Sequence, residues 1–324
     1  MSWSLIALLA VLAYAAGCIA YVYRWRGRLR YASFGQYLRK SWPVFAPLNC
    51  LMYMGTQRWA RQPVLDAGYL RGVELLRSHW RVIRDEALAL HASGAFEAAK
   101  APGSAGSYDV GFRTFFKRGW SKFYLTWYGR PHPSAQRLCP RTLALVRQVP
   151  GIRGAMFSIL PPGAELSLHS DPMACCLRYH LGLQTPNSGQ CYIHVDGQAC
   201  VWHDGEDFVF DETYPHLALN GTDQSRLIFM CDVDRPLNAC GHWVRAAYAL
   251  MAKATRVPNT DEDPRGLFSE LFMRLAPLRE RALRLRETRR RTYKALTLFL
   301  NSTLLTALLA MLFGVLRFIE IALS

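Results

Sequence analysis

The residues best suited to chemistry lie in one short stretch, LSLHSDP at residues 166–172. His169 and Asp171 are two residues apart, and side chains at that spacing in a β-strand point to the same face. An imidazole beside a carboxylate can supply two of the three ligands of a 2-His-1-carboxylate iron site, whose third ligand is a distant histidine. Such a triplet alone is common on protein surfaces. The rest of the chain must therefore supply the third ligand and the elements that position all three.

A β-rich region surrounds this stretch. Short apolar runs alternate with turn signals in the order GAMFSIL, ELSLH, CCLRYHLGL, CYIHV, CVWH, DFVFD, HLALN and SRLIFMCDV, all within residues 151–235. The sequence VDGQ at residues 195–198 is a hairpin signal. Eight short strands at this spacing predict a mainly β catalytic core, a barrel or a double-sheet jelly roll with flanking helices.

His216 is the best candidate for the third ligand, because it opens the run HLALN directly after an acidic turn. Three other histidines compete with it: His180, His194 and His203. The last two lie beside Asp-Gly turns and are expected to be solvated. Asp211 and Glu212, in the acidic turn, are expected to be turn residues that support the site and do not bind the metal.

The pattern H-x-D…H…R is formed by His169, Asp171, His216 and Arg226, which follows His216 by ten residues. This pattern resembles that of the Fe(II)/2-oxoglutarate dioxygenases. Within this class the chain resembles the aspartyl/asparaginyl β-hydroxylase family. Its motifs L-R-x-H-L-G-L, W-x-x-G…F-D-[DE]…H…N and R-L-I-F…D-V…P are matched in order at residues 177–183, 202–220 and 226–236. Within this family, the two apolar ends of the chain and the H-x-D-P form of its motif resemble the bacterial lipid A 2-hydroxylases.

The resemblance implies a double-stranded β-helix of cupin type and an oxygenase that uses Fe(II), 2-oxoglutarate and O2. It implies hydroxylation of a lipid A acyl chain at C2, with release of succinate and CO2. The implied iron ligands are His169, Asp171 and His216, and the implied 2-oxoglutarate contacts are Ser158, Arg178, His180 and Arg226.

Physical arguments support some of these roles. An arginine can form a bidentate pair with the distal carboxylate of 2-oxoglutarate. Arg178 and His180 share one strand face, and burying both without an anion is costly. For Ser158 an ordinary hydrogen bond at a turn edge stays open, and for Arg178 a structural salt bridge.

Two uncharged runs, residues 2–23 and 295–316, are long enough to span a bilayer. Basic residues follow the first run and precede the second, so the positive-inside rule places the middle of the chain in the cytoplasm and both ends outside. A cleaved signal peptide is disfavoured because no basic residue precedes the first run. We therefore expect a bacterial inner-membrane protein with a cytoplasmic catalytic domain.

The formal net charge is +15, which alone would suit nucleic acid, anionic lipid or an acidic substrate. Ten of these charges flank the two apolar runs, four within residues 24–30 and six within 279–294. Topology and lipid head groups explain them, so no nucleic-acid partner is expected. The expected partners are the membrane and lipid A or a related phosphorylated glycolipid. The nine cysteines contain no C-x-x-C pair, which disfavours a zinc site.

The chain is thus expected to comprise a membrane helix, a helical segment, the dioxygenase domain, a basic helical segment and a second membrane helix, at residues 1–23, 24–110, 111–240, 241–294 and 295–316. Aromatic side chains between Phe115 and Tyr128 are expected to pack or to form a wall near the membrane, with contact to the substrate as the alternative. Three other functions stay open: a peptide aspartyl/asparaginyl hydroxylase, a membrane-tethered sensor of a metal or organic acid, and a zinc hydrolase.

Overall fold

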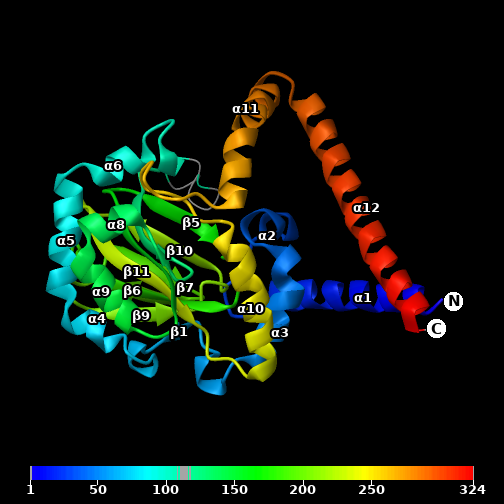
Figure 1. Cartoon of the computed structure of the whole chain (residues 1–324), viewed down its shortest axis with the longest axis horizontal. Helices are drawn as coiled ribbons and strands as arrows, with labels where there is room; N and C mark the ends of the chain where they lie inside the picture. The colour runs from blue at the N-terminus through cyan, green and yellow to red at the C-terminus, as the bar shows by residue number, and fades with distance from the viewer. Residues whose placement is uncertain (1, 108, 110–115, 117, 324) are drawn as a thin grey trace.

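Two antiparallel β-sheets form the centre of the protein, seen here in a computed structural model that describes residues 2–107, 109, 116 and 118–323 (Figure 1). The larger sheet has the strand order β1-β9-β6-β11-β4-β2-β3 and the smaller one β5-β10-β7-β8. The larger sheet consists of β1 (Val64–Leu65), β2 (Ser121–Trp127), β3 (Arg130–Pro131), β4 (Ile152–Leu160), β6 (Cys176–Gln184), β9 (Asp207–Phe210) and β11 (Arg226–Asp234). The smaller sheet consists of β5 (Glu165–His169), β7 (Cys191–Val195), β8 (Gln198–Val201) and β10 (His216–Asn220). The predicted jelly-roll core is confirmed.

All eight predicted strands are present, and one of them is shifted. Strand β8 begins at Gln198, two residues before the predicted run, because Asp196 and Gly197 alone close the hairpin between β7 and β8. Their φ angles of +48° and +95° are those that a two-residue hairpin turn requires. Strands β1, β2 and β3 were not predicted. Phe123 and Tyr124 of β2 are buried, which confirms the predicted packing of these aromatic residues, while Phe115 lies outside the described residues.

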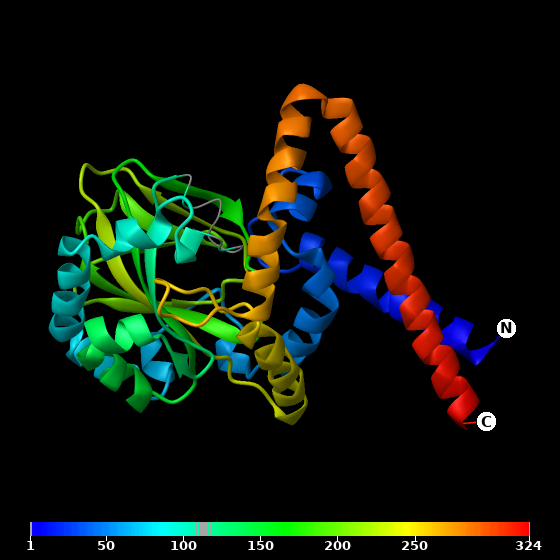
Figure 2. The ribbon, with the colours of Figure 1, turned by 45° about the horizontal axis from the view of Figure 1, so that its top comes forward.

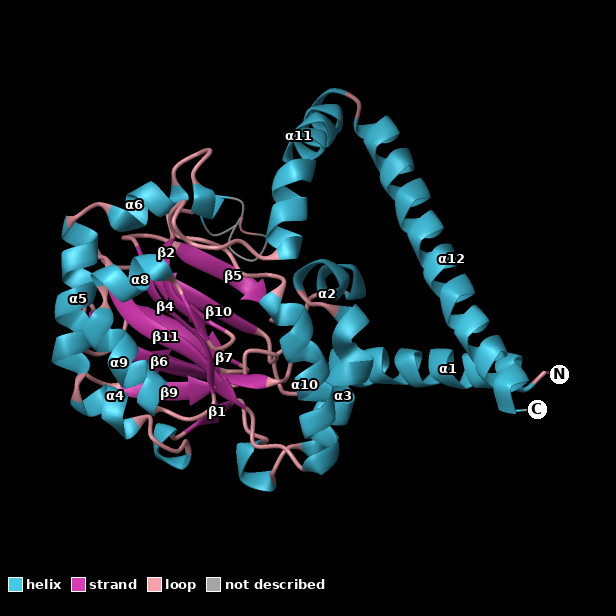
Figure 3. Ribbon diagram, in the orientation of Figure 1, coloured by secondary structure: helices cyan, strands magenta, loops and turns pink. Residues whose placement is uncertain are grey.

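One face of the larger sheet packs against helices (Figure 3). Alternation along β6 directs Leu177, Tyr179 and Leu181 into this layer, where all three are fully buried. Burying a side chain of this size contributes about 1.5–3 kcal/mol, so the helical layer is an integral part of the core. The helices are α4 (Glu74–Ser78), α5 (Trp80–Ala92), α6 (Ala95–Lys100), α8 (Pro133–Leu138) and α9 (Pro140–Gln148).

The other face of the larger sheet looks toward the smaller sheet. Between the two sheets lies a second apolar cluster, to which Ile193, Ala218, Ile228 and Met230 contribute. The even-numbered positions Arg178 and His180 of β6 also face this side, where both line a cavity. The predicted division of β6 into a polar and an apolar face is thus confirmed.

The remaining helices form a wall beside the sheets and two long extensions (Figures 1 and 2). Two helices are long and apolar enough to cross a membrane: α1, and α12 from its first residue to Ala322. Their far ends meet, since the backbone N–H of Trp3 donates to Glu320 Oε1 at 3.0 Å. The α-helices are α1 (Trp3–Arg24), α2 (Phe34–Lys40), α3 (Ala46–Gly55), α10 (Ala239–Lys253), α11 (Leu267–Thr288) and α12 (Arg290–Leu323). The short 3-10 helices are η1 (Pro43–Phe45), η2 (Arg58–Ala60), η3 (Ala67–Tyr69) and η4 (Ala105–Ser107).

The division of the chain into five segments stays a prediction. Its boundary at residue 111, the predicted start of the dioxygenase domain, lies outside the described residues.

Candidate active site

The three predicted metal ligands come together at one edge of the smaller sheet. His169 ends β5 and His216 begins β10, and the two residues are direct partners in the register of these antiparallel strands. Their ring centroids are 4.1 Å apart. One ligand atom from each histidine and one from Asp171 all lie within 4.8 Å of one another. Strand pairing thus creates the pair of imidazoles, and the H-x-D spacing adds the carboxylate.

The backbone orients both imidazole rings. His169 Nδ1 lies 3.0 Å from the carbonyl oxygen of Ser167, and His216 Nδ1 lies 2.9 Å from that of Tyr214. In each ring Nδ1 therefore donates, and Nε2 carries the lone pair that a metal requires. Burial lowers the pKa of both rings, that of His216 to about 3. Both histidines are neutral, which suits them to bind a divalent cation.

Asp171 lies just beyond the end of β5, which ends at His169 as the predicted run ELSLH does, so strand alternation alone does not orient the carboxylate. Its position is set by its backbone N–H, which donates to the carbonyl oxygen of Glu212 at 2.9 Å. Burial raises the pKa of Asp171, but the opposing influences, of which the charge of Arg178 is the largest, lower the pKa to about 2. The carboxylate is ionised and ready to bind a metal.

Arg178 is surrounded by carboxylates. Nη1 lies 2.6 Å from Asp171 Oδ2, Nε lies 3.0 Å from Asp232 Oδ1, and Nη2 forms an ion pair with Glu212. Burial lowers the pKa of Arg178, but the three acids outweigh burial and raise it well above its usual value. Burial, Asp232 and Asp171 together raise the pKa of Glu212 well above its usual value despite Arg178. Nε, Nη1 and Nη2 of Arg178 thus each contact a different carboxyl group.

Arg226 has the opposite surroundings. It is 1% exposed, and within the described part of the chain no carboxylate pairs with it. Its Nη2 reaches Ser158 Oγ at 3.4 Å, and its guanidinium lies 4.3 Å from the ring centroid of Trp202. Its Nε has no hydrogen-bond partner among the residues that the structure describes. Burial lowers its pKa to about 10. A buried cation that lacks a counterion calls for an anionic ligand.

His180 supports the same interpretation. Trp202 Nε1 donates to His180 Nδ1 at 3.3 Å, so the hydrogen of the neutral ring is on Nε2. That buried atom has no partner among the described residues. Burial and the charges of Arg226 and Arg178 lower the pKa of His180 well below its usual value. Arg226 and His180 thus offer unused donors, a fit for the carboxylates of 2-oxoglutarate.

The three predicted metal ligands form one end of the site, the metal end, and Arg226 and His180 form the other, the anion end. Both ends share one cavity of about 420 Å³. The Phe210 ring bridges the two ends, because its centroid lies 5.0 Å from that of His180 and 5.6 Å from that of His216. Most of the remaining wall is aromatic or aliphatic and comes from segments outside the motifs, including Trp42, Trp127, Tyr128, Tyr248, Val257 and Phe268.

Sequence reasoning missed three features of this site. Asp232 lies within the matched block D-V but was given no role, and it holds Arg178. Trp202 also lies within a matched block, and it orients both His180 and Arg226. Tyr248 and Phe268 carried no signal, because they reach the cavity from helices that follow the sheet. The competing histidines His194 and His203 do not line the cavity.

Comparisons with known proteins agree with this geometry. The family model for aspartyl/asparaginyl beta-hydroxylase matches residues 77–236. An ornithine lipid ester-linked acyl 2-hydroxylase of Rhizobium tropici is 38% identical over 43% of this chain and 49% of its own length. The human aspartyl/asparaginyl beta-hydroxylase is 33% identical over 53% of this chain and 22% of its own length. The chain thus spans half or less of these relatives.

Among solved structures, a cupin domain of an XRE family transcriptional regulator from Enterobacter cloacae covers 35% of this chain and 95% of its own, with 16% identity and a TM-score of 0.25. That score is too low to add to what the two sheets establish. The family match spans β5, β6, β10 and Arg226. Through residues 77–236, the chain belongs to the aspartyl/asparaginyl β-hydroxylase family.

Proposed function

We propose that the protein is an Fe(II)- and 2-oxoglutarate-dependent hydroxylase that acts at C2 of an acyl chain of a membrane lipid, with lipid A as the substrate. The observation that carries the proposal is the single cavity that joins a His-Asp-His triad to an unpaired buried arginine. When bound, the iron and 2-oxoglutarate would supply the oxidation: one atom of O2 enters the acyl C–H bond, and the other leaves in succinate as CO2 is released.

The chain's own residues have separate tasks in this proposal. His169, Asp171 and His216 would hold the iron. Arg226 and His180 bind the carboxylates of 2-oxoglutarate, with Ser158 beside them. We propose that Arg178 does not contact 2-oxoglutarate, because three acids already occupy it. It instead holds Asp171 in place for the metal.

The cavity wall supports a lipid acyl chain as the substrate. Trp42 and Phe268 line the cavity and are about half exposed at its rim. Helices α3, α10 and α11 also expose Leu48, Trp243 and Leu271, which adds apolar surface on this side of the domain. Polar side chains such as Asp109, Thr255 and Ser269 are a minority of the wall, which favours an acyl chain over a peptide aspartate or asparagine as the substrate.

The surroundings support a membrane location. We propose that helices α1 and α12 are two anchors, and the basic residues beside them favour a catalytic domain at the cytoplasmic face of the bacterial inner membrane. The Rhizobium relative's name favours ornithine lipid as a second candidate substrate. Both candidates present an acyl chain whose C2 lies beside a carbonyl group.

Mass spectrometry of lipids from cells with and without the protein tests the proposal. We expect one added oxygen atom on an acyl chain of lipid A, and fragmentation should place the hydroxyl at C2. The same change in ornithine lipid alone would establish the second candidate. If neither lipid changes while the purified protein releases succinate from 2-oxoglutarate, the lipid substrate is wrong and the oxygenase class stands.

A further inference from the structure

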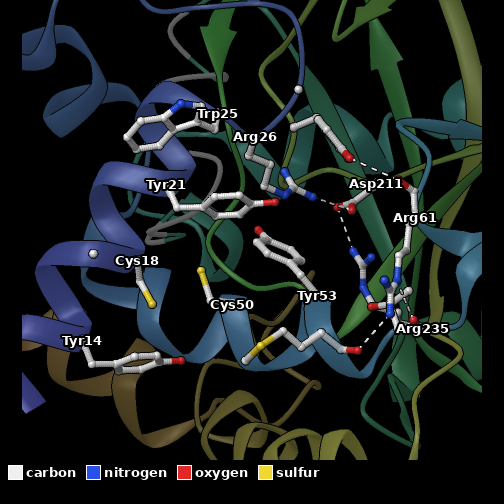
Figure 4. A pocket seen from close by; sticks show the side chains of 15 residues that line it. Tyr14, Cys18, Tyr21, Trp25, Arg26, Cys50, Tyr53, Arg61, Asp211 and Arg235 are labelled. Carbon is white, nitrogen blue, oxygen red and sulfur yellow. Dashed lines mark hydrogen bonds and ion pairs between the residues drawn. The ribbon is translucent and has the colours of Figure 1, made fainter.

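A second cavity, of about 560 Å³, lies where α1 meets the catalytic domain (Figure 4). Helices α1 and α3 form one side of it, and the turn between β9 and β10 forms the other. Asp211 of this turn lines the second cavity, whereas the next residue, Glu212, lines the active-site cavity. The turn therefore separates the two cavities, and the second one contains none of the proposed iron or 2-oxoglutarate contacts.

The inner end of this cavity is built around Arg26, which is 6% exposed. Its guanidinium lies between two aromatic rings, 3.9 Å from the centroid of Tyr53 and 3.7 Å from that of Tyr214. Nη2 pairs with Asp211 Oδ2 at 2.8 Å, but the buried Nη1 has no partner among the described residues. Stacking and the ion pair hold the guanidinium rigidly and leave one donor unused.

The charges that line the cavity do not balance. Asp211 is the one carboxylate among its described lining residues, and it already pairs with both Arg26 and Arg235, in each case at 2.8 Å. Arg61 adds a third guanidinium, whose Nε and Nη2 donate only to the carbonyl oxygens of Thr56 and Met54. Three guanidinium groups against one carboxylate leave an excess of two positive charges, which an oxyanion such as a phosphate can neutralise.

The outer end of the cavity is apolar and runs along the proposed anchor. Tyr14, Gly17 and Cys18 of α1 line it, and from Tyr14 to Arg24 the helix rises about 15 Å. Trp3 and Trp25 stand at or just beyond the two ends of α1, the positions that aromatic residues favour at the two surfaces of a bilayer. The arginine end then lies at the level of the lipid head groups, and the apolar end lies beside the acyl chains.

We propose that this second cavity binds the oxyanion head group of a membrane lipid, with an acyl chain lying along α1. The site goes beyond the proposed hydroxylation, because it needs neither iron nor 2-oxoglutarate to be occupied. The arginines neutralise a phosphate or carboxylate group, and the tyrosines and glycine of α1 accommodate the apolar part of the lipid.

Binding of lipids to the purified, delipidated full chain in detergent tests the proposal, with native mass spectrometry as the readout. The probes are dioleoylphosphatidylglycerol, uncharged dioleoylglycerol and inorganic phosphate. We expect one phosphatidylglycerol to bind at least about tenfold more tightly than dioleoylglycerol, the difference that charged hydrogen bonds provide. Inorganic phosphate should compete with it.

Arg61→Glu is the main variant, because Arg61 is exposed and pairs with no acid. It should weaken phosphatidylglycerol binding about tenfold. Arg58→Glu is the matched control, because Arg58 is exposed, lies in the same segment and does not line the cavity. The Arg58→Glu protein should bind phosphatidylglycerol as tightly as the wild type does. Arg26→Gln should weaken binding further, provided that thermal unfolding shows the variant to be folded.

Equal binding of the two diacyl lipids, or equal weakening by Arg61→Glu and Arg58→Glu, would overturn the anion site. Phosphate binding that phosphatidylglycerol fails to displace would overturn the lipid as its occupant. Turnover is not measured in these experiments, so their failure leaves the proposed hydroxylase function untouched.

Discussion

Two arginines line the active-site cavity, and their surroundings are opposite. Arg178, at the metal end, contacts Asp171, Glu212 and Asp232. Arg226, at the other end, is more deeply buried and lies against Trp202 and Ser158 without an acid. A guanidinium that the fold has already neutralised is part of the scaffold, whereas a buried one that it has not neutralised is prepared for a ligand. The pattern of unpaired groups thus separates residues that hold the site from residues that bind the cosubstrate.

The largest expected effect tests the metal end directly. Asp171→Ala should reduce succinate release from 2-oxoglutarate by well over about a hundredfold, since loss of a residue that merely supports a metal ligand already costs 10–100-fold. Bound iron in the purified protein should fall with it. His194→Ala is the matched control, because His194 lies on β7 outside the cavity. Activity retained by Asp171→Ala would show that another group completes the ligand set.

Arg178→Met should have the next largest effect, and on stability. Removing this guanidinium leaves Asp171 and Asp232 close together without a counterion, which costs about 3–5 kcal/mol for a buried pair. Chemical denaturation of the iron-free protein measures the loss. Arg153→Met is the control: its pair with Asp234 is partly exposed and contributes at most about 1 kcal/mol. Equal losses in the two variants would contradict a structural role for Arg178.

Arg226→Met should leave stability unchanged or raise it, because it removes a buried charge that has no partner. The KM for 2-oxoglutarate should rise about 10–100-fold, the value of one or two charged hydrogen bonds. Succinate release at increasing 2-oxoglutarate concentrations measures this effect. An unchanged KM together with a large loss of stability would reverse the roles assigned to the two arginines.

The site's residues were predictable to different degrees, for physical reasons. The strands of the core follow from alternation of apolar residues, and His169, His216 and Arg226 follow from spacing within motifs. The pairing of Arg178 with Asp232 and Glu212 was not predictable, because it depends on β11 and the β9–β10 turn lying next to β6. Its two possible roles, salt bridge and cosubstrate contact, were both consistent with the sequence.

The cavity wall was the least predictable part. Tyr128 lies before the β-rich region, and Tyr248 and Phe268 lie after it, yet all three line the cavity. No local periodicity links residues so far apart, and only the folded arrangement of α10 and α11 beside the sheets brings them together. Substrate preference therefore depends on segments that the motifs do not include.

His180 gives the smallest and most specific test of the anion end. Its pKa in the folded protein lies well below its usual value because of burial and nearby cations. Below about pH 6.5 the unfolded chain therefore takes up a proton at this residue that the folded protein does not, and stability falls by up to about 1.4 kcal/mol per pH unit. His180→Gln should remove this contribution, so stability should fall less steeply than in the wild type between about pH 6.5 and 5.5. Denaturation curves of both proteins across that interval measure the difference, with His194→Gln as the control. Parallel pH profiles of the wild type and His180→Gln would mean that His180 is protonated in the folded state. That result would contradict the neutral His180 proposed for the anion end of the cavity.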